Sequence, residues 1–386
     1  MMKRMNNQEC PSKKSVNAVL ERKSPDYIPL GLYTIDCDLA SQILGRKTLV
    51  RDKIGQQLSL WEGHRDELAE SVKVDAVELY RRLDCVDLIL PAKCVPILPP
   101  RDYCPPKVKK LSKDTWECED GYTYKAAFGT NEMVRIETGK ELPSAKDFSD
   151  FTFVSPDESI FEAYDYFIEK LTVDRFICGH TGTFDVMALP GGMERGLMQY
   201  YLDPCAVRAQ IKWNLEEGNF LDQFYNRKGV DGFMMEQDFS TTLAPLMSVE
   251  MFRDFCFPAM RDRVANVKRF GKKIILHSCG RTWAYLDMFV EAGFDCYQSL
   301  QTGVMDLGEL KSRYGGSLAF WGGVPVEHLL KGTPEDVRQD VRKAMEAGRG
   351  NGGFILGPSH SIAYGTKYDN FMAMLDEHDH LKYTIT

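Results

Sequence analysis

The sequence contains no run of apolar residues that approaches the roughly 20 needed to cross a bilayer, so it predicts no membrane-spanning helix. It also lacks an excess of positive charge, because 48 basic and 56 acidic residues give a formal net charge of −8. Nucleic-acid binding requires a concentrated positive field, and the short basic stretch 107–113 does not supply one. We therefore expect neither a membrane nor a nucleic-acid partner.

No CxxC pair occurs among the 11 cysteines, and their odd number does not fit a framework of paired disulfides. The polar, basic stretch 1–14 lacks the apolar segment of a secretory signal. Both features favour a cytoplasmic protein whose cysteines are reduced. The 386 residues are 44% hydrophobic and 27% charged, a balance typical of a folded chain rather than a disordered one.

From residue 151 onward, short apolar runs of strand length alternate with longer segments of helical period. Helices are predicted over 251–269, 283–292 and 334–347. The predicted strands of this region are Arg175–His180, Gly232–Asp238, Lys273–Cys279, Asp295–Leu300, Leu318–Gly323 and Gly353–Leu356. Repeated units of a strand followed by a helix predict an α/β protein with a parallel sheet.

A further strand near the start, 27–33, makes a (β/α)8 barrel, or TIM barrel, the most economical fold. We predict one barrel domain over residues 1–386. The alternative is a doubly wound open sheet, but no GxGxxG follows the first strand. The stretch 91–106 is rich in proline, and 116–136 alternates apolar and polar residues. We therefore predict a small accessory β insertion, or flap, within about 85–150 in the N-terminal half.

In such barrels the reactive groups lie where the strands end. The strand that starts at Lys273 delivers His277 and Cys279 two positions apart, on one face of an extended chain and about 6.5 Å from each other. An imidazole and a thiolate at this spacing can bind one zinc ion, so the pair forms half of a candidate metal site. The alternative is a hydrogen-bonded core histidine beside an inert, buried cysteine.

Three other strand ends carry polar side chains. One breaks at Gly-Pro and presents His360, which is either a functional side chain or a histidine bonded to backbone at a turn. Another ends on Glu236 and Asp238, whose burial costs free energy unless a metal, a substrate cation or a neighbouring arginine faces them. The third offers amide groups such as Gln298, which either hold a substrate or cap a loop.

Five motifs between residues 229 and 370 occur together: VDGFMMEQD, PLMSVEMFRDFCFP, IILHSCGRTW, GGVPVEHLLKGTPEDV and GGFILGPSHSIAYGTKYDNFMAM. Together they resemble the uroporphyrinogen decarboxylase superfamily, and within it the zinc-dependent methyltransferases that work with corrinoid proteins. Weaker likeness extends upstream through PGGMERGLMQYYLDP and SVNAVLERKSPDYIPLG, whereas 85–150 is not covered. The resemblance implies a (β/α)8 barrel whose site lies at the carboxyl ends of the strands.

Within this superfamily, the decarboxylases carry an arginine-rich motif near the N-terminus that binds porphyrin carboxylates. This chain has no arginine there and reads LYTIDCDLAS after the first strand. The methyltransferases hold zinc with an HxC motif and a later cysteine, so the resemblance makes His277 and Cys279 metal ligands. The third position falls on His360, which either replaces cysteine as a ligand or marks the loss of zinc. The decarboxylases also carry a histidine at the position of His360. Cys279 is therefore the residue that better distinguishes the methyltransferases from the decarboxylases.

The resemblance implies an enzyme that moves a methyl group, with the help of zinc, between a corrinoid protein and a small methylated substrate such as a methoxylated aromatic. Glu236 and Asp238 are then the catalytic candidates for proton transfer. The substrate-binding candidates are Tyr33, Gln298 and Trp321. The alternatives are a tetrahydrofolate-dependent methyltransferase, a metal-free decarboxylase, and a ligand-binding barrel without catalysis.

Overall fold

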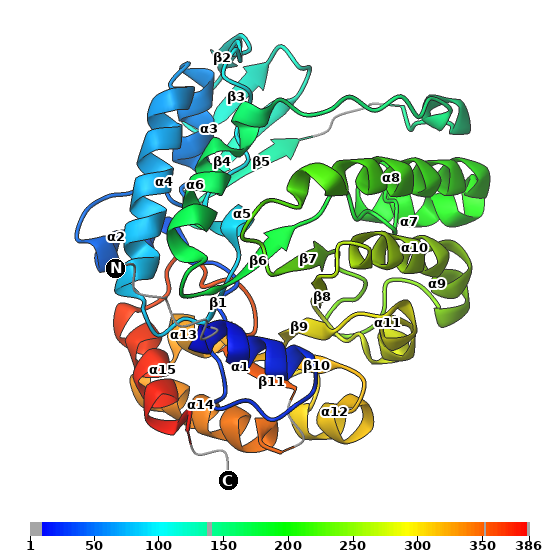
Figure 1. Cartoon of the computed structure of the whole chain (residues 1–386). Coiled ribbons are helices and arrows are strands. Elements are labelled where there is room, and N and C mark those ends of the chain that lie inside the picture. The colour runs from blue at the N-terminus through cyan, green and yellow to red at the C-terminus, as the bar shows by residue number, and fades with distance from the viewer. Residues whose placement is uncertain (1–9, 137–140, 351–352, 384–386) are drawn as a thin grey trace, which may run out of the picture.

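The centre of the molecule is a curled parallel sheet of seven strands in the order β1-β6-β7-β8-β9-β10-β11 (Figure 1). They are β1 (Leu88–Ile89), β6 (Phe176–His180), β7 (Gly232–Glu236), β8 (Lys273–His277), β9 (Cys296–Leu300), β10 (Ala319–Val324) and β11 (Phe354–Pro358). The computed structural model describes residues 10–136, 141–350 and 353–383, so most of the polar stretch 1–14 lies outside it. The α/β class is confirmed. The strands follow one another across the sheet in the order of the chain, whereas in a doubly wound sheet the strand order reverses at one point.

An extended segment lies between the two edge strands of the sheet. Leu30 forms a parallel bridge with Leu356 of β11, and Gly31 forms one with Leu88 of β1. The amide of Gly31 donates to the Leu356 carbonyl at 2.9 Å, and the amide of Leu88 donates to the Leu30 carbonyl at 3.2 Å. The strand expected over 27–33 is therefore reduced to single bridges that join the two edges of the sheet.

Helices that follow the strands in the chain cover the outer face of the sheet. They are α6 (Glu162–Leu171), α7 (Met193–Leu202), α8 (Pro204–Tyr225), α9 (Val249–Phe255), α10 (Phe257–Lys268), α11 (Leu286–Ala292), α12 (Leu307–Tyr314), α13 (Val326–Lys331), α14 (Pro334–Gly348) and α15 (Tyr368–Leu381), with 3-10 turns η2 (Glu158–Phe161) and η3 (Trp283–Tyr285). The helix predicted over 251–269 is divided at Cys256, because Pro258 lacks a backbone N–H and sits in the first turn of α10.

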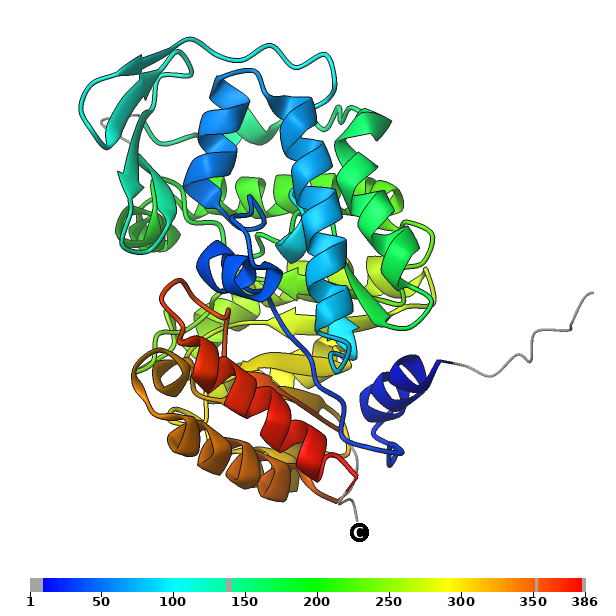
Figure 2. The same cartoon turned by 90° about the vertical axis from the view of Figure 1, so that its left-hand side faces the viewer.

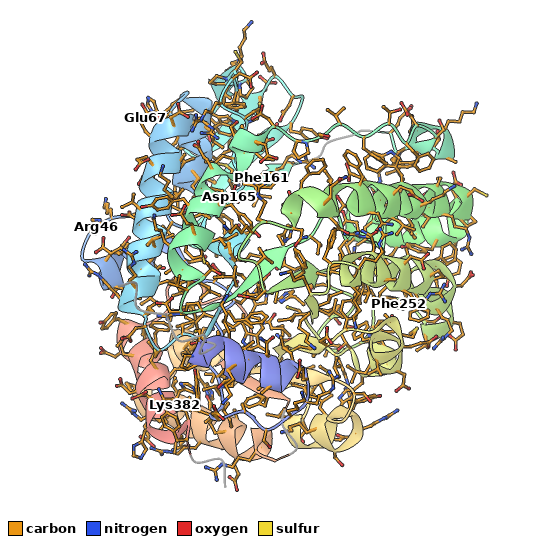
Figure 3. The ribbon with its side chains drawn as sticks, viewed as in Figure 1. Arg46, Glu67, Phe161, Asp165, Phe252 and Lys382 are labelled. Atoms are coloured by element: carbon orange, nitrogen blue, oxygen red, sulfur yellow. The ribbon has the colours of Figure 1, made fainter. Side chains whose placement is uncertain are left out.

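Buried apolar side chains fill the space between the sheet and these helices. Phe161 and Phe252 are among the fully buried aromatic residues, and Phe252 stacks on Tyr285 with ring centroids 4.2 Å apart (Figure 3). A second cluster fills the inner side of the sheet, where α1 (Pro11–Leu20) packs against the first residues of the strands. Its members are Val16, Val19, Leu20, Tyr33, Leu88, Leu90, Phe176, Cys178, Met234, Ile275, Cys296, Ala319, Trp321 and Ile355.

A separate antiparallel sheet is formed by β2 (Val108–Lys110), β3 (Thr115–Cys118), β4 (Thr123–Ala127) and β5 (Glu132–Ile136). It lies beside α3 (Lys53–Trp61), at the end of the molecule opposite α14 and α15 (Figures 1 and 2). The remaining elements of the N-terminal half are α2 (Cys37–Leu44), α4 (Arg65–Arg82), α5 (Pro91–Cys94) and η1 (Ala145–Phe148). Trp116 of β3 packs on Trp61 of α3 with ring centroids 5.9 Å apart. The alternating pattern over 116–136 therefore forms antiparallel strands.

Among the residues that the structure describes, none of the helices combines the length and the apolar character needed to span a membrane.

Candidate metal centre

The loop that follows β8 places two candidate ligands side by side. Ile274, Ile275 and Leu276 are fully buried, so this strand is fixed in the centre of the sheet. Beyond it, the Cys279 amide donates to Asp238 at 2.7 Å, which holds the loop against the end of β7. Gly280 has a φ of 86°, and a Cβ at this position would lie 2.5 Å from the Thr241 carbonyl oxygen. Only glycine fits this turn without strain.

His277, Cys279 and His360 converge at the carboxyl end of the sheet. Each can offer one ligand atom, and these three atoms all lie within 4.8 Å of one another. Cys279 Sγ is 3.5 Å from Nε2 of His277, and the rings of His277 and His360 are 5.3 Å apart. Two imidazoles and one thiol are donors that zinc prefers, and a set of three leaves a fourth position for a substrate. The donor chemistry therefore fits a catalytic zinc ion.

The orientation of the His277 ring is fixed by its neighbours. Nδ1 contacts the side-chain oxygen of Gln298, and the ring stacks on Tyr33 with centroids 4.5 Å apart. An amide oxygen only accepts hydrogen bonds, so this contact is a hydrogen bond in the tautomer that carries the imidazole proton on Nδ1. In that tautomer Nε2 presents its lone pair towards Cys279.

Burial dominates the ionisation of the three candidate ligands. It lowers the pKa of His277, and it lowers the pKa of His360 to about 4, with a further contribution from His277. Both imidazoles are thus neutral near pH 7 and able to bind a metal. Burial, reinforced by Asp238, raises the pKa of Cys279 to about 12, so without a cation the thiol stays protonated. Metal binding at this site would release that proton.

Glu236 ends β7 and forms an ion pair with Lys93, at 2.5 Å between Oε2 and Nζ. Burial on its own would raise the pKa of Glu236, but Lys93, His180 and His277 together hold the pKa below its ordinary value. The cation expected to face this carboxylate is therefore a lysine. Asp238 lies two positions further along, where its side chain is exposed and accepts the Cys279 amide.

Alternate residues of four neighbouring strands build one polar layer at this end of the sheet. Each comes two positions after a residue of the inner apolar cluster, so it faces the same side of its strand. The members of the polar layer are His180, Glu236, His277 and Gln298. No sequence motif indicated a role for His180 or Lys93. One feature of the sequence could have pointed to Lys93. It follows the short apolar run that becomes β1, just as the other polar residues of the site stand at the ends of their strands.

The three candidate substrate-binding residues lie at different depths. Tyr33 belongs to the inner apolar cluster but reaches the polar layer, with Lys93 Nζ 5.2 Å from its ring centroid and the His360 ring 5.6 Å away. Gln298 is fully buried against His277. Trp321 is also fully buried and belongs to the inner apolar cluster, where its Nε1 donates to the Gly31 carbonyl at 3.2 Å. Of the three, Tyr33 is the one placed beside both histidines.

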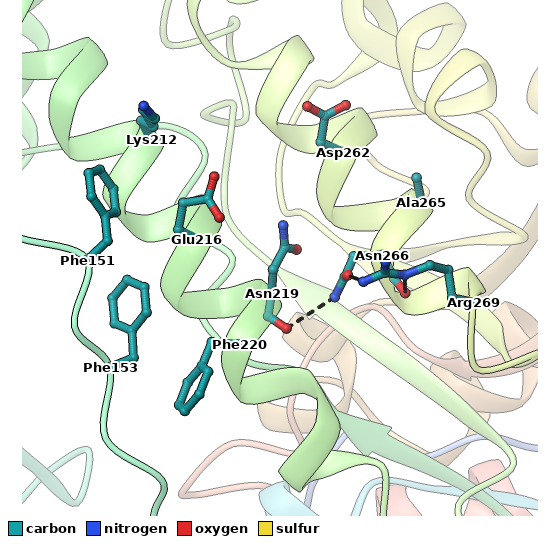
Figure 4. A pocket seen from close by; sticks show the side chains of 10 residues that line it. All are labelled: Phe151, Phe153, Lys212, Glu216, Asn219, Phe220, Asp262, Ala265, Asn266 and Arg269. Atoms are coloured by element: carbon teal, nitrogen blue, oxygen red, sulfur yellow. Dashed lines mark hydrogen bonds between the residues drawn. The ribbon is translucent and has the colours of Figure 1, made fainter.

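A separate groove lies on the helical layer, outside the sheet. It has a volume of about 760 Å³ and runs between α8, α10 and the segment that carries Phe151 and Phe153 (Figure 4). The residues that line it include Lys212, Asp262 and Arg269, and none of the three candidate metal ligands. The groove is therefore distinct from the polar layer.

Comparisons with known proteins agree with this fold. A family model described as uroporphyrinogen decarboxylase (URO-D) matches residues 145–381, more than half of the chain. Among solved structures, a methyltransferase from Methanosarcina mazei is similar, with a TM-score of 0.64 and 16% sequence identity over 97% of this chain and 99% of that chain. No curated protein matches the chain. At 16% identity the structural likeness describes the fold alone. The resemblance seen in the sequence is confirmed, and the chain belongs to the uroporphyrinogen decarboxylase family.

Proposed function

We propose that the protein is a zinc-assisted methyltransferase that moves a methyl group between a small methylated substrate and a corrinoid carried by a partner protein. The observation that carries the proposal is the convergence of His277, Cys279 and His360 at the carboxyl end of the sheet. A decarboxylase that works without metal has no need for a thiol between two imidazoles. The fold is shared with a methyltransferase as well as with the decarboxylase family, so the ligand set and not the fold carries this choice.

In this proposal His277, Cys279 and His360 hold the zinc ion, which when bound supplies Lewis acidity towards the heteroatom that carries the methyl group. In the demethylating direction, the bond between the methyl carbon and the heteroatom breaks. The electron pair stays on the heteroatom, and cob(I)alamin supplies the pair for the new bond to the methyl group. The heteroatom then takes up a proton from water, and we assign Glu236 and Asp238, the carboxyl groups at the end of β7, to hold and orient that water as hydrogen-bond acceptors.

Two residues that contact the polar layer, Tyr33 and Lys93, are proposed to shape the place of the substrate. Tyr33 stacks on His277 and lies beside His360, so its ring forms one wall next to the ligand set. A flat substrate such as a methoxylated aromatic could pack against such a wall, because aromatic rings attract one another in stacked and tilted arrangements. Lys93 neutralises Glu236, so the layer does not repel a substrate that carries partial negative charge.

The proposed architecture follows from the two bridges at the sheet edges. We assign the segment around Leu30 and Gly31 as the eighth strand, which closes a single (β/α)8 barrel domain. The flap expected within about 85–150 is then confined to the residues after α5, because β1 and Lys93 belong to the barrel, and its antiparallel sheet (108–136) stands beside the barrel. The corrinoid partner would approach the carboxyl end of the barrel, where the three candidate ligands lie.

The test is a methyl-transfer assay with zinc-loaded protein, cob(I)alamin and a panel of methoxybenzenes that begins with 2-methoxyphenol. We expect the cob(I)alamin absorption to decay into that of methylcobalamin, at a rate proportional to enzyme concentration. The matched control is Cys205→Ser, since Cys205 is exposed at the start of α8, whereas Cys279→Ser should abolish turnover. Equal turnover by the two variants would contradict the proposal.

A further inference from the structure

Gln298 carries a buried side-chain amide, and apolar packing alone does not explain a polar group at this position. It lies in the middle of β9 and has no exposed surface. Its oxygen contacts Nδ1 of His277, and its nitrogen has no hydrogen-bond partner among the described residues. An unpaired N–H in the interior costs free energy that an apolar side chain of similar size would avoid. Among the described residues, His277 is therefore the partner of this side-chain amide.

That contact follows from the register of the sheet. The Cα atoms of His277 and Gln298 are paired across β8 and β9, and the Ser278 amide donates to the Gln298 carbonyl at 2.9 Å. Paired residues of adjacent strands face the same side, so the two side chains meet on the inner face. Tyr33 covers the face of the imidazole and limits its rotation.

We infer that Gln298 is a positioning residue that keeps the proton of His277 on Nδ1 and so directs Nε2 towards the metal. This inference rests on the proposed function for the identity of the metal. In free histidine the proton favours Nε2, which would block the nitrogen that faces Cys279 at 3.5 Å. The amide oxygen reverses this preference before any metal arrives. The burial of Gln298 favours this role over the substrate contact expected from the sequence.

The first test measures zinc affinity by competition with a chromophoric chelator. We expect Gln298→Leu to weaken zinc binding by about 10- to 100-fold, the range found when the hydrogen-bond partner of a ligand is removed. Gln298→Glu should keep the affinity, because a carboxylate also accepts from Nδ1. Gln237→Leu is the matched control, since the Gln237 amide bonds at 2.9 Å to both the N–H and the carbonyl of Met187. It should bind zinc as the native chain does.

The second test reads the tautomer directly, without metal. The seven histidines are labelled with 15N in the ring, and the His277 signals are assigned from their loss in His277→Ala. We expect the metal-free native protein and Gln298→Glu to show His277 protonated on Nδ1, and Gln298→Leu to show the proton on Nε2. The refuting result is read from the native chain, so it does not depend on whether Gln298→Leu folds.

Two results would overturn the inference: a native His277 that carries its proton on Nε2, or native zinc affinity in a folded Gln298→Leu. A native chain that binds no zinc would instead overturn the metal-assisted function. Because the tautomer is measured in metal-free protein, the two failures are distinguishable.

Discussion

Replacement of Lys93 by methionine tests the electrostatics of the polar layer. The Lys93 and Glu236 side chains are 23% and 16% exposed, so water screens their ion pair only in part. Removing one partner of a buried pair leaves an uncompensated charge, at a cost of roughly 3–5 kcal/mol. Since both groups keep some contact with water, we expect Lys93→Met to lower the free energy of unfolding by about 3 kcal/mol at pH 7.

The stability lost in Lys93→Met should depend on pH, and the direction of this dependence follows from the pKa of Glu236. In the native chain the pKa of Glu236 lies below its ordinary value of 4.5, so the carboxylate contributes stability above that value and loses it as the pH falls through the lowered pKa. Without Lys93, burial dominates and raises the pKa of Glu236. The carboxylate is then destabilising at pH 7, and this cost disappears as it takes up a proton. The deficit of Lys93→Met should therefore shrink as the pH approaches 4.

Urea denaturation at several pH values measures the effect. The matched control is Lys170→Met, because Lys170 pairs at 2.9 Å with Glu169 on the exposed surface of α6 and water screens that pair. The double variant Lys93→Met/Glu236→Gln should recover most of the lost stability, since no charge is then left unpaired. The reasoning fails if Lys93→Met is no less stable than Lys170→Met, or if its deficit is the same at pH 5 and pH 7.

Two further predictions concern the frame around the site. Asp222→Ala should lower the free energy of unfolding by roughly 3–5 kcal/mol in urea denaturation, because Asp222 and Arg263 form a fully buried ion pair. The exposed Asp254, partner of Arg208, serves as its control and should lose little on replacement by alanine. Gly280→Ala should weaken zinc binding in the chelator assay, because the new Cβ forces the Cys279 loop away from Thr241. Gly303→Ala, where a Cβ meets nothing within 4 Å, should leave zinc affinity unchanged.

The strands from β6 onward could be predicted because each is a short, buried apolar run between turn residues. β1 could not, because its two strand residues follow Asp87, a charge that interrupts the apolar pattern. In the structure Asp87 accepts hydrogen bonds from Ser12 at 2.7 Å and Tyr27 at 2.5 Å. These partners lie far away in the sequence, so only the folded chain shows why a buried carboxylate is tolerated there.

The candidate site could be predicted in part for a similar reason. His277 and Cys279 share a face through local spacing alone, which any extended strand provides. The pairing of Glu236 with Lys93 depends on β1 and β7 ending at the same edge of the sheet, and the proline-rich surroundings of Lys93 indicated only a loop. The same limit applies to Gln298, whose contact with His277 requires the register between β8 and β9.

The central claim is that the two histidines and the cysteine bind one metal ion. Elemental analysis of protein purified without a histidine tag tests it most directly, with Cys279→Ser compared against Cys205→Ser. We predict about one zinc per chain in the native protein and in Cys205→Ser, and its loss in Cys279→Ser. A native chain that holds no zinc after resupply, or Cys279→Ser protein that keeps a full complement, would contradict the account.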